Sequence, residues 1–417
     1  MDKLNVELYG VPLGTLTQND KGFDFVTDPG ALVKYQLSSN IMSLAVPLNL
    51  RYTSVQRRRL NNFFSELLPE GRNFEWLMQS LPKDGRTPYR MLRRYGKDIA
   101  GALIIYDPED PASDNEAEAE PVDGKEIRYL LEHMPQAALA NSFDSGKTSL
   151  GGVQGKIVLA KSGALWHRVH NGYPSTHILK PVVPEYPTMI YDEDFCMRMA
   201  KKSGLTAFPV WIESFDSADA LVIERYDRSS EVEGGRLHQE DFNQAIGAHG
   251  SEKYQEYGGK VSAKRIAQIL ARFGKSGDVK KFASQLIFAI ATGNLDMHAK
   301  NVSLLHFPDE SIALAPVYDQ VPLRHQNTDG RMALAVGGEY IHANLSLSDI
   351  ARELTSWQCS GFSGEAGTLA FIKDCLEIYD NALKETEPNG KAYPYLKEDI
   401  SSFIFNLLSG KKIGKTY

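Results

Sequence analysis

The feature that most constrains this chain is the nonapeptide GNLDMHAKN at residues 293–301, a polar run set between apolar segments. Before it, residues 281–292 carry large apolar side chains at helical spacing, which predicts a buried amphipathic helix. After it, residues 302–305 and 312–315 predict two short strands. A loop held between rigid elements of this kind is where catalytic groups concentrate.

Three polar residues stand at the ends of these expected elements: Asp296, Asn301 and Asp319. An Asp, an Asn five residues later and a further Asp after a strand is the order of groups in a kinase catalytic loop. In such a loop the first Asp accepts the proton of the attacking hydroxyl, and the other two residues hold magnesium. The alternative is a polar turn, because Asp and Asn favour turns and His298 could be an ordinary packed histidine. The nonapeptide alone leaves both interpretations open.

Composition narrows the class of protein. A length of 417 residues predicts two or three domains, and 42% hydrophobic residues with 24% charged residues suffice for a large buried core. The three cysteines, Cys196, Cys359 and Cys375, are far apart and predict buried thiols in a reducing compartment. The sequence shows neither a signal peptide nor a run of 18 apolar residues, so we expect a cytoplasmic protein without a membrane anchor.

Charge is unevenly distributed along the chain. The net charge of -7 does not favour nucleic-acid binding by the molecule as a whole. Residues 51–97, however, hold 11 Lys and Arg against 4 Asp and Glu. This basic stretch could approach a phosphate backbone if another protein supplied the specific contacts, or it could be a solvated helical surface. Residues 107–124 carry eight acids and no base, which predicts a linker or an exposed loop.

The first hundred residues predict a compact α+β unit. Helical spacing of apolar residues covers 57–81, and residues 99–105 predict a closing strand. The other expected strands lie at residues 4–8, 11–16, 23–26 and 43–46, the first two forming a hairpin.

A glycine-rich segment, KTSLGGVQGK at residues 147–156, leads into an expected strand at 157–160. Glycines permit backbone conformations in which N–H groups approach a phosphate closely, although a glycine-rich hairpin turn would look the same. The hydroxyl groups of Thr148 and Ser149 are potential acceptors for a phosphoryl group lying over this loop.

Downstream, residues 176–181 predict a strand that carries Lys180, and residues 192–202 predict a helix. A strand lysine after a glycine-rich loop is what a nucleotide kinase needs to neutralise phosphate charge. Glu193, or less readily Asp194, could pair with this lysine. A surface lysine and an exposed acid in the first helical turn are the alternatives.

Residues 221–228 predict a strand that leaves this sheet, where Glu224 and Tyr226 would offer backbone groups to an adenine edge, although apolar residues here could equally be core. A sheet, a hinge and then helices with a catalytic loop among them is a bilobal protein-kinase plan. We therefore expect an α+β fold with a sheet-rich N-terminal lobe, a helical C-terminal lobe and an extra N-terminal subdomain. The expected helices of the second lobe are 241–246, 264–273, 281–292, 348–354, 369–383 and 400–408.

Taken together, these segments resemble the HipA family of bacterial serine/threonine protein kinases, toxins of type II toxin–antitoxin pairs. The resemblance covers nearly the whole chain, in matching order. The segments that carry it are residues 43–48, 63–69, 99–102, 149–156, 176–180, 223–228, 238–241, 296–301 and 318–319.

The resemblance implies an ATP- and Mg²⁺-dependent kinase in which Asp296 is the catalytic base, and Asn301 and Asp319 are the metal ligands. The ATP-binding residues that it implies are Gly151, Gly152, Val153, Lys156, Lys180, Glu224, Tyr226, His298 and Asn301. It divides the chain into an N-terminal subdomain (1–106), an acidic linker (107–124), a kinase N-lobe (125–228) and a helical C-lobe (229–417).

The resemblance also implies regulation and partners. In such kinases a serine at the position of Ser149 is autophosphorylated, and a phosphate there adds roughly two negative charges where the phosphates of ATP should lie. Gly155 and the preceding Thr148 depart from the usual family residues, so the resemblance supports the autophosphorylation site less strongly than the base. Met297 also departs from the family pattern, with little expected consequence. The implied partners are a dimeric helix-turn-helix antitoxin like HipB, DNA bound through that antitoxin, and a protein substrate such as the glutamyl-tRNA synthetase.

Two other functions fit parts of the pattern. A small-molecule phosphotransferase shares the spacing from Asp296 to Asn301. A catalytically silent subunit of a DNA-bound repressor is the other, although a purely structural role would not need all four of Lys180, Asp296, Asn301 and Asp319.

Overall fold

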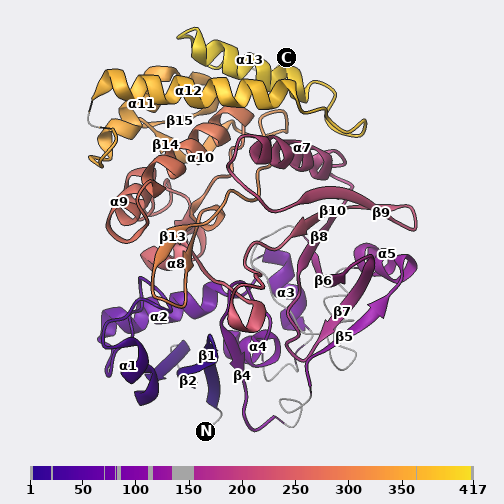
Figure 1. Ribbon diagram of the computed structural model, residues 1–417, viewed down its shortest axis with the longest axis vertical. Coiled ribbons are helices and arrows are strands. Elements are labelled where there is room, and N and C mark those ends of the chain that lie inside the picture. The colour runs from indigo at the N-terminus through magenta and orange to yellow at the C-terminus, as the bar shows by residue number, and fades with distance from the viewer. Residues whose placement is uncertain are drawn as a thin grey trace.

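The computed structural model describes residues 3–19, 22–69, 71–79, 81, 86–110, 116–133, 155–362 and 364–414. The first hundred residues form an antiparallel four-stranded sheet, in the order β3-β2-β1-β4, covered by helices (Figure 1). Its strands are β1 (Lys3–Leu8), β2 (Val11–Asn19), β3 (Gly22–Thr27) and β4 (Ile104–Tyr106). Its helices are α1 (Pro29–Tyr35), α2 (Ser54–Glu66), α3 (Gly71–Gln79) and α4 (Pro88–Tyr95).

This N-terminal unit has a hydrophobic core of its own. Buried residues alternate along β1, and the inward face of α2 contributes Leu60, Phe63 and Phe64 to the core. The helix α2 begins where Thr53 and Gln56 form a capping box, which satisfies backbone N–H groups that the first turn would leave unpaired. The predicted hairpin is confirmed, and the helical spacing expected over 57–81 corresponds to α2 and α3, with a break after Glu66.

Two expected strands of this unit are wrong or shortened. Residues 43–46 form no strand, because the Ser43 hydroxyl accepts hydrogen bonds from the N–H groups of Ala45 and Val46 and thereby closes a local turn. The strand expected at 99–105 is reduced to β4, since the chain turns at Gly101, whose φ is +80°.

The second unit is an antiparallel six-stranded sheet in the order β5-β7-β6-β8-β10-β9. In its register Lys180 lies opposite Leu221. The strands are β5 (Glu118–Val122), β6 (Ile157–Ser162), β7 (Leu165–His170), β8 (His177–Pro181), β9 (Val210–Phe215) and β10 (Ala218–Glu224). Two helices accompany the sheet, α5 (Gly124–Glu132) and α7 (Met189–Lys202).

Here the structure corrects two details. The segment 107–124, expected to be a linker or exposed loop, contains β5, which pairs with β7 at the edge of the sheet. The strand expected at 221–228 ends at Glu224, and the following residues leave the sheet.

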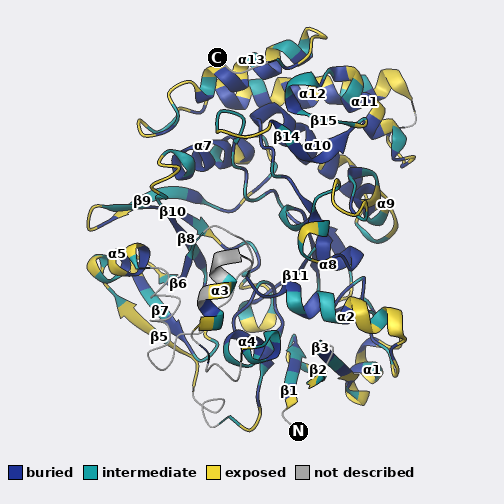
Figure 2. Ribbon diagram, turned by 180° about the vertical axis from the view of Figure 1, so that it is seen from behind, coloured by how far each residue is buried: buried dark blue, intermediate teal, exposed yellow. Residues whose placement is uncertain are grey.

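The remaining residues form a mainly helical lobe around α10 (Asp278–Thr292), which is buried along most of its length (Figure 2). The other helices are α8 (Phe242–Ile246), α9 (Ala263–Phe273), α11 (Leu347–Ser356), α12 (Glu365–Lys384) and α13 (Leu396–Leu408). Short strands flank them: β11 (His238–Asp241), β12 (Ser303–His306), β13 (Ile312–Leu314), β14 (Arg331–Val336) and β15 (Glu339–Ile341). Single 3-10 turns occur at η3 (Glu233–Gly235), η4 (Gly250–Lys253), η5 (Ala299–Asn301) and η6 (His342–Asn344).

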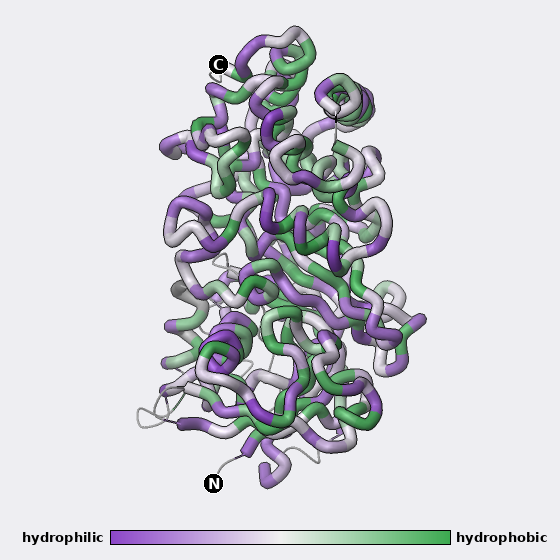
Figure 3. The backbone as a smooth tube through the Cα atoms, turned by 90° about the vertical axis from the view of Figure 1, so that its left-hand side faces the viewer, coloured by the Kyte–Doolittle hydropathy of each residue, from purple (hydrophilic) through white to green (hydrophobic). Residues whose placement is uncertain are grey.

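Hydrophobic and hydrophilic residues are interleaved along the chain (Figure 3). In the part of the chain that the structure describes, no helix has the length and apolar character needed to cross a membrane. All three cysteines are buried and free, as their spacing predicts.

Candidate active site

The loop that carries Asp296 is fixed at both ends. The helix α10 stops at Gly293, whose φ of +70° lies in the left-handed region that favours glycine. A Cβ atom at this position would lie 2.8 Å from Cβ of Arg324, so a larger residue would push the loop away. After the turn η5, the chain enters β12, which pairs with β11 and β13. The predicted setting of the nonapeptide, between a buried helix and a strand, is confirmed.

The Asp296 carboxylate is held but accessible. The Tyr254 hydroxyl donates a hydrogen bond to Oδ1 over 3.2 Å, and Nε2 of His298 lies 3.8 Å from Oδ2. The Asp296 side chain is 43% exposed, whereas that of His298 is 8% exposed. The backbone N–H of Asp296 donates to Oδ1 of Asn294 over 2.9 Å, which fixes the loop beneath the carboxylate. A half-exposed carboxylate with a fixed orientation suits a general base that must meet a substrate hydroxyl.

The Asn301 side chain is tied to the same loop. Its Nδ2 donates a hydrogen bond to the backbone oxygen of Asp296 over 2.8 Å. The amide nitrogen is therefore engaged within the loop, and the amide oxygen is the atom with which Asn301 could bind a cation. This arrangement fits the predicted role of a metal ligand.

Lys180, Glu193 and Asp319 meet although they are far apart in sequence. The Lys180 ammonium, on β8, lies 2.8 and 3.0 Å from the two carboxylate oxygens of Glu193 on α7. It also donates to Oδ1 of Asp319 over 2.6 Å. The Lys180 and Glu193 side chains are 6% and 0% exposed, while Asp319 is 36% exposed. The predicted partner of the strand lysine is thus Glu193; Asp194 pairs instead with Arg198.

The charges of this cluster influence one another. Burial opposes the charge on Lys180, but Asp319 and Glu193 outweigh it and raise the pKa of the ammonium. Burial likewise raises the pKa of Asp319, but Lys180 overrides this and holds it at about 2. The pKa of Lys156 is lowered to about 8, first by burial and then by the positive charge of Lys180. The positive charge of Lys180 thus acts on Lys156 as well as on the two carboxylates.

Asp319 has an unusual backbone conformation. Its φ is +55°, a left-handed value that costs a residue with a side chain of order 1–3 kcal/mol. The side chain of Asn294 donates to the Asp319 backbone oxygen over 3.4 Å, which helps to hold this conformation. Such strain is found where a functional side chain must point in one direction, here toward Lys180.

The donor set fits Mg²⁺ bound together with a polyphosphate. Among the described residues, no group of three or more His, Cys, Asp or Glu side chains could hold a metal ion by itself. Magnesium in nucleotide enzymes is bound by one or two carboxylates plus substrate phosphates and water. Asn301 and Asp319 would supply the protein ligands of such a site.

The segment after β10 is the expected hinge. The N–H of Glu224 donates to the Pro209 oxygen over 3.0 Å, which leaves the Glu224 carbonyl as the group that could meet an adenine. The Tyr226 hydroxyl donates to Oε1 of Gln239, and its ring lies 5.6 Å from that of Tyr318. Burial raises the pKa of Tyr226, so its hydroxyl stays a donor.

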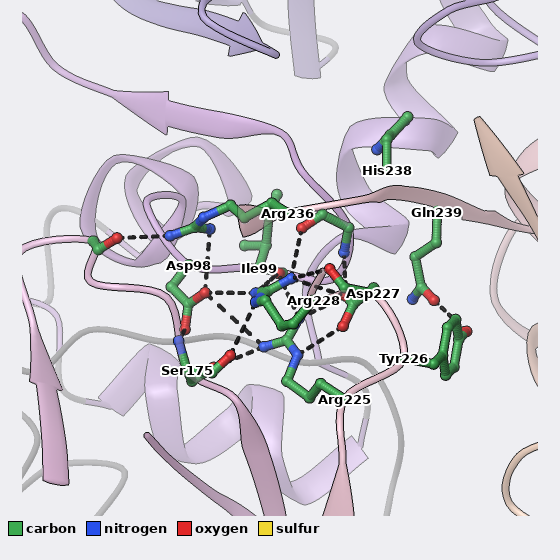
Figure 4. Close-up of polar contacts among 12 residues, drawn as sticks. Asp98, Ile99, Ser175, Arg225, Tyr226, Asp227, Arg228, Arg236, His238 and Gln239 are labelled. Carbon is green, nitrogen blue, oxygen red and sulfur yellow. Dashed lines mark hydrogen bonds and ion pairs between the residues drawn. The ribbon is translucent and has the colours of Figure 1, made fainter. Parts of the chain in front are cut away.

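The two residues that alternate with the hinge positions anchor it (Figure 4). The Arg225 guanidinium binds both carboxylate oxygens of Asp227 over 2.9 and 2.7 Å. Both side chains also contact the N-terminal unit: Arg225 donates to the Ile99 oxygen over 3.0 Å, and Asp227 accepts from the Gly101 N–H over 2.7 Å. The hinge is therefore attached directly to the N-terminal unit.

Part of the predicted site lies outside the described residues. This applies to Thr148, Ser149, Gly151, Gly152 and Val153, so their expected roles stay predictions. Sequence reasoning missed Tyr254 and Asn294, which orient Asp296. Asn294 stands within the nonapeptide and could have been suspected, whereas Tyr254 comes from an irregular segment without a periodic signal.

Comparison with known proteins identifies the family of this chain. Residues 4–106 match the model of the HipA N-terminal domain, and residues 148–382 match that of the HipA-like C-terminal domain. The chain belongs to the HipA family. The resemblance inferred from the sequence motifs is confirmed.

Two relatives and one solved structure extend the comparison. A Sinorhizobium fredii protein that carries the name of a kinase, Y4mE, is 32% identical over 340 residues, 79% of this chain and 78% of its own. The serine/threonine-protein kinase toxin HipA of Shewanella oneidensis is 28% identical over 346 residues, again 79% and 78% of the two chains.

The solved structure is a complex of HipA, HipB and operator DNA from Shewanella oneidensis. It matches with a TM-score of 0.78 at 22% identity, over 97% of this chain and 96% of that one. This similarity concerns the fold, and it confirms the predicted kinase-like α+β architecture of the HipA-family chain.

Proposed function

We propose that this HipA-family protein is an ATP- and Mg²⁺-dependent serine/threonine protein kinase. The proposal rests on two ion pairs of the Lys180 ammonium, with a carboxylate oxygen of Glu193 over 2.8 Å and with one of Asp319 over 2.6 Å. This is the arrangement that a kinase needs before it can hold the phosphates of ATP. Membership of the family, and the kinase names of its relatives, support the same activity.

Each residue then has a chemical task. Lys180 and Lys156 bind the phosphates of ATP, and Asn301 and Asp319 hold the metal. Mg²⁺, when bound, neutralises phosphate charge as it develops during transfer. Asp296 orients the serine or threonine hydroxyl and accepts its proton. The hydroxyl oxygen forms a bond to the γ-phosphorus, the bond from that phosphorus to the bridging oxygen breaks, and ADP leaves.

We further propose regulation at the glycine-rich loop. Transfer of a phosphate to Ser149 would add roughly two negative charges to the glycine-rich segment that leads into Lys156. The modified segment would then compete with the phosphates of ATP for the positive charges of Lys156 and Lys180. Thr148 is the alternative acceptor.

We also propose that the protein is the toxin of a toxin–antitoxin pair in the cytoplasm. The partner would be a helix-turn-helix antitoxin like HipB, which contacts DNA on behalf of the complex. The similarity to the HipA, HipB and operator DNA complex supports this partner, and the net charge of -7 agrees with DNA recognition by another subunit. The first protein substrate to test is the glutamyl-tRNA synthetase, which the family resemblance suggests.

The decisive experiment compares dephosphorylated wild-type protein with Asp296→Asn, using ATP, Mg²⁺ and phosphopeptide mapping. Loss of a general base lowers the rate by about 10²–10⁴-fold, so phosphate on Ser149 or on an added substrate should nearly vanish. Asp309→Asn is the control, because the Asp309 carboxylate accepts from the Ser311 N–H of its own turn over 3.0 Å. Full activity of Asp296→Asn would refute the assignment of the base. Failure of the wild type to bind ATP would favour a silent repressor subunit.

A further inference from the structure

One buried acid of the N-terminal unit reaches the catalytic loop. Glu66, the last residue of α2, accepts a hydrogen bond from the Lys300 ammonium over 2.7 Å. The side chains of Glu66 and Lys300 are 3% and 7% exposed. Lys300 stands in η5, directly before Asn301 and four residues after Asp296. The ion pair therefore crosses from the N-terminal unit to the segment between the expected base and the expected metal ligand.

Both carboxylate oxygens of Glu66 accept hydrogen bonds from the helical lobe. Its second oxygen, Oε1, accepts from Nδ1 of His249 over 2.7 Å and from the N–H of Gly250 over 2.9 Å. Burial alone would raise the pKa of Glu66, but His249 and Lys300 lower it to about 2. The carboxylate is therefore charged at neutral pH, and its donors His249, Gly250 and Lys300 all come from the kinase part of the chain.

Lys300 links this contact to the metal site. Its backbone oxygen accepts a hydrogen bond from the Tyr318 hydroxyl over 2.7 Å, and Tyr318 directly precedes Asp319. The Tyr318 hydroxyl also lies 2.6 Å from Oγ of Ser303, at the start of β12. One short chain of contacts thus joins α2 to the two segments that carry Asn301 and Asp319.

A buried ion pair is a poor way to hold two domains together. Taking two charges out of water often costs as much as their attraction returns, and well-packed apolar residues would attach α2 at least as well. What such a pair provides is a defined position for each charged group, more than a gain in stability. The contact is therefore better explained by the position that it imposes on Lys300 than by adhesion.

We propose that Glu66 is a positioning residue through which the N-terminal unit sets the catalytic loop. It acts through Lys300, touches no substrate, and makes the kinase site depend on the neighbouring unit. This inference rests on the proposed kinase function, but its structural part can be tested without any activity.

The chain supplies a matched control on the same helix. One turn before Glu66, Asn62 donates from Nδ2 to the backbone oxygen of Gly247 over 3.0 Å, at the end of α8. Figures 1 and 2 show α2 directly beside α8. Asn62 thus crosses the same interface as Glu66, but its hydrogen bond ends at the Gly247 backbone oxygen and not at Lys300. Asn62→Ala weakens docking alone, whereas Glu66→Gln removes the charge that holds Lys300.

The first measurement is hydrogen–deuterium exchange of the loop peptide 293–303 in wild type, Glu66→Gln and Asn62→Ala. We expect faster exchange of this peptide in Glu66→Gln, and wild-type exchange in Asn62→Ala. Unchanged exchange in a folded Glu66→Gln protein would overturn the proposal, as would equal acceleration in both variants. Neither result depends on phosphotransfer.

The second measurement is steady-state phosphotransfer at varied ATP and Mg²⁺. A misplacement of about 1 Å costs up to about 10²-fold, so Glu66→Gln should lower kcat by about 10- to 100-fold. The KM for ATP should stay near wild type, since Lys180 lies on the other lobe, while the Mg²⁺ requirement should rise. Lys300→Met should show the same pattern, and the double variant should add little. A wild type without phosphotransfer would refute the proposed function; a changed KM with unchanged kcat would refute the positioning role.

Discussion

The Lys180 ammonium and the Asp319 carboxylate lie 2.6 Å apart, joining β8 to a segment of the other lobe. Glu193 approaches the same ammonium from α7, so one cation serves two carboxylates. Because Glu193 is fully buried, its charge is tolerated only while Lys180 is present. This relationship makes Lys180 a structural residue of the site as well as a proposed phosphate ligand.

We therefore expect Lys180→Met to lower the free energy of unfolding. Removing one partner of a buried pair costs about 3–5 kcal/mol, because the remaining charge is uncompensated. The pKa of Glu193 is raised, first by burial, and would rise further without the lysine. A raised carboxyl pKa means that stability falls as pH rises through it, so the loss should be larger at pH 8 than at pH 5.

Urea unfolding at both pH values measures this loss. The double variant Lys180→Met/Glu193→Gln should recover part of the lost stability, because the fully buried side chain at position 193 then carries no charge that lacks its partner. A double variant less stable than Lys180→Met would show that Glu193 is held by contacts other than this lysine.

The lowered pKa of Lys156 predicts that nucleotide binding depends on pH. Its pKa of about 8 would rise when phosphates of ATP approach, so binding takes up a proton above pH 8. Affinity should be greatest below pH 8 and fall by up to about tenfold per unit as pH rises beyond it. Calorimetry with a non-hydrolysable ATP analogue, in buffers of different ionisation enthalpy, measures both the affinity and the proton uptake. Lys156→Met should bind more weakly and without this uptake; an unchanged pH profile would assign the effect elsewhere.

Local patterns in the sequence identified most elements, whereas long-range contacts set the details that were missed. Apolar spacing located α10 because this helix is buried and ends at a glycine. Residues 43–46 have the apolar alternation of a strand, but Ser43 bonds to its own turn and donates to Glu240, a partner 197 positions away. No local pattern reports such a partner.

The candidate site shows the same limit. Lys180, Glu193 and Asp319 could be proposed because the order of kinase elements is known, and the structure brings them together. The residues that orient Asp296 come partly from a segment without periodicity, at Tyr254. The bond from Glu66 to Lys300 spans 234 positions and two units of the chain, so only the folded arrangement reveals it.

The Asp98 carboxylate links the N-terminal unit to the segment that follows β10. Its carboxylate lies within 2.8 Å of Arg228 and 3.2 Å of Arg236, and it is 1% exposed (Figure 4). Burial would raise the pKa of Asp98, but Arg228, Arg225 and Arg236 lower it below its ordinary 3.8. Its contribution to stability is therefore complete above pH 3.8 and is lost as pH falls below that value.

Asp98→Asn leaves buried arginines undercompensated, and we expect a loss of about 3–5 kcal/mol at pH 7. The difference from wild type should shrink below pH 4, because the Asp98 carboxylate of the unfolded wild-type chain then takes up a proton before that of the folded protein. Urea unfolding at pH 7, 5 and 3.5, followed by tryptophan fluorescence, measures this difference. A difference that stays constant over this range would exclude the charge of Asp98 as its cause.

The contacts of Asp192, beside Glu193 on α7, predict that this residue influences the affinity for ATP. Its buried carboxylate accepts from Oγ1 of Thr188 and from the N–H of Tyr393, both over 2.7 Å. It also lies 3.2 Å from Nε2 of His325, six residues after Asp319, and the His325 and Tyr393 rings are stacked at 4.1 Å. These contacts fix the helical turn that presents Glu193 to Lys180.

Asp192→Asn should therefore loosen α7 and raise the KM for ATP by about tenfold, because hydrogen bonds to a charged group contribute roughly 1.5–3 kcal/mol. Asp194→Asn is the matched control on the same helix, since Asp194 pairs with Arg198 four residues along and not with the segment after Asp319. Steady-state kinetics at varied ATP measure both variants. If Asp194→Asn raised KM as much as Asp192→Asn, the helix as a whole would be responsible. If only Asp192→Asn did so, the segment after Asp319 would control the lysine–glutamate pair.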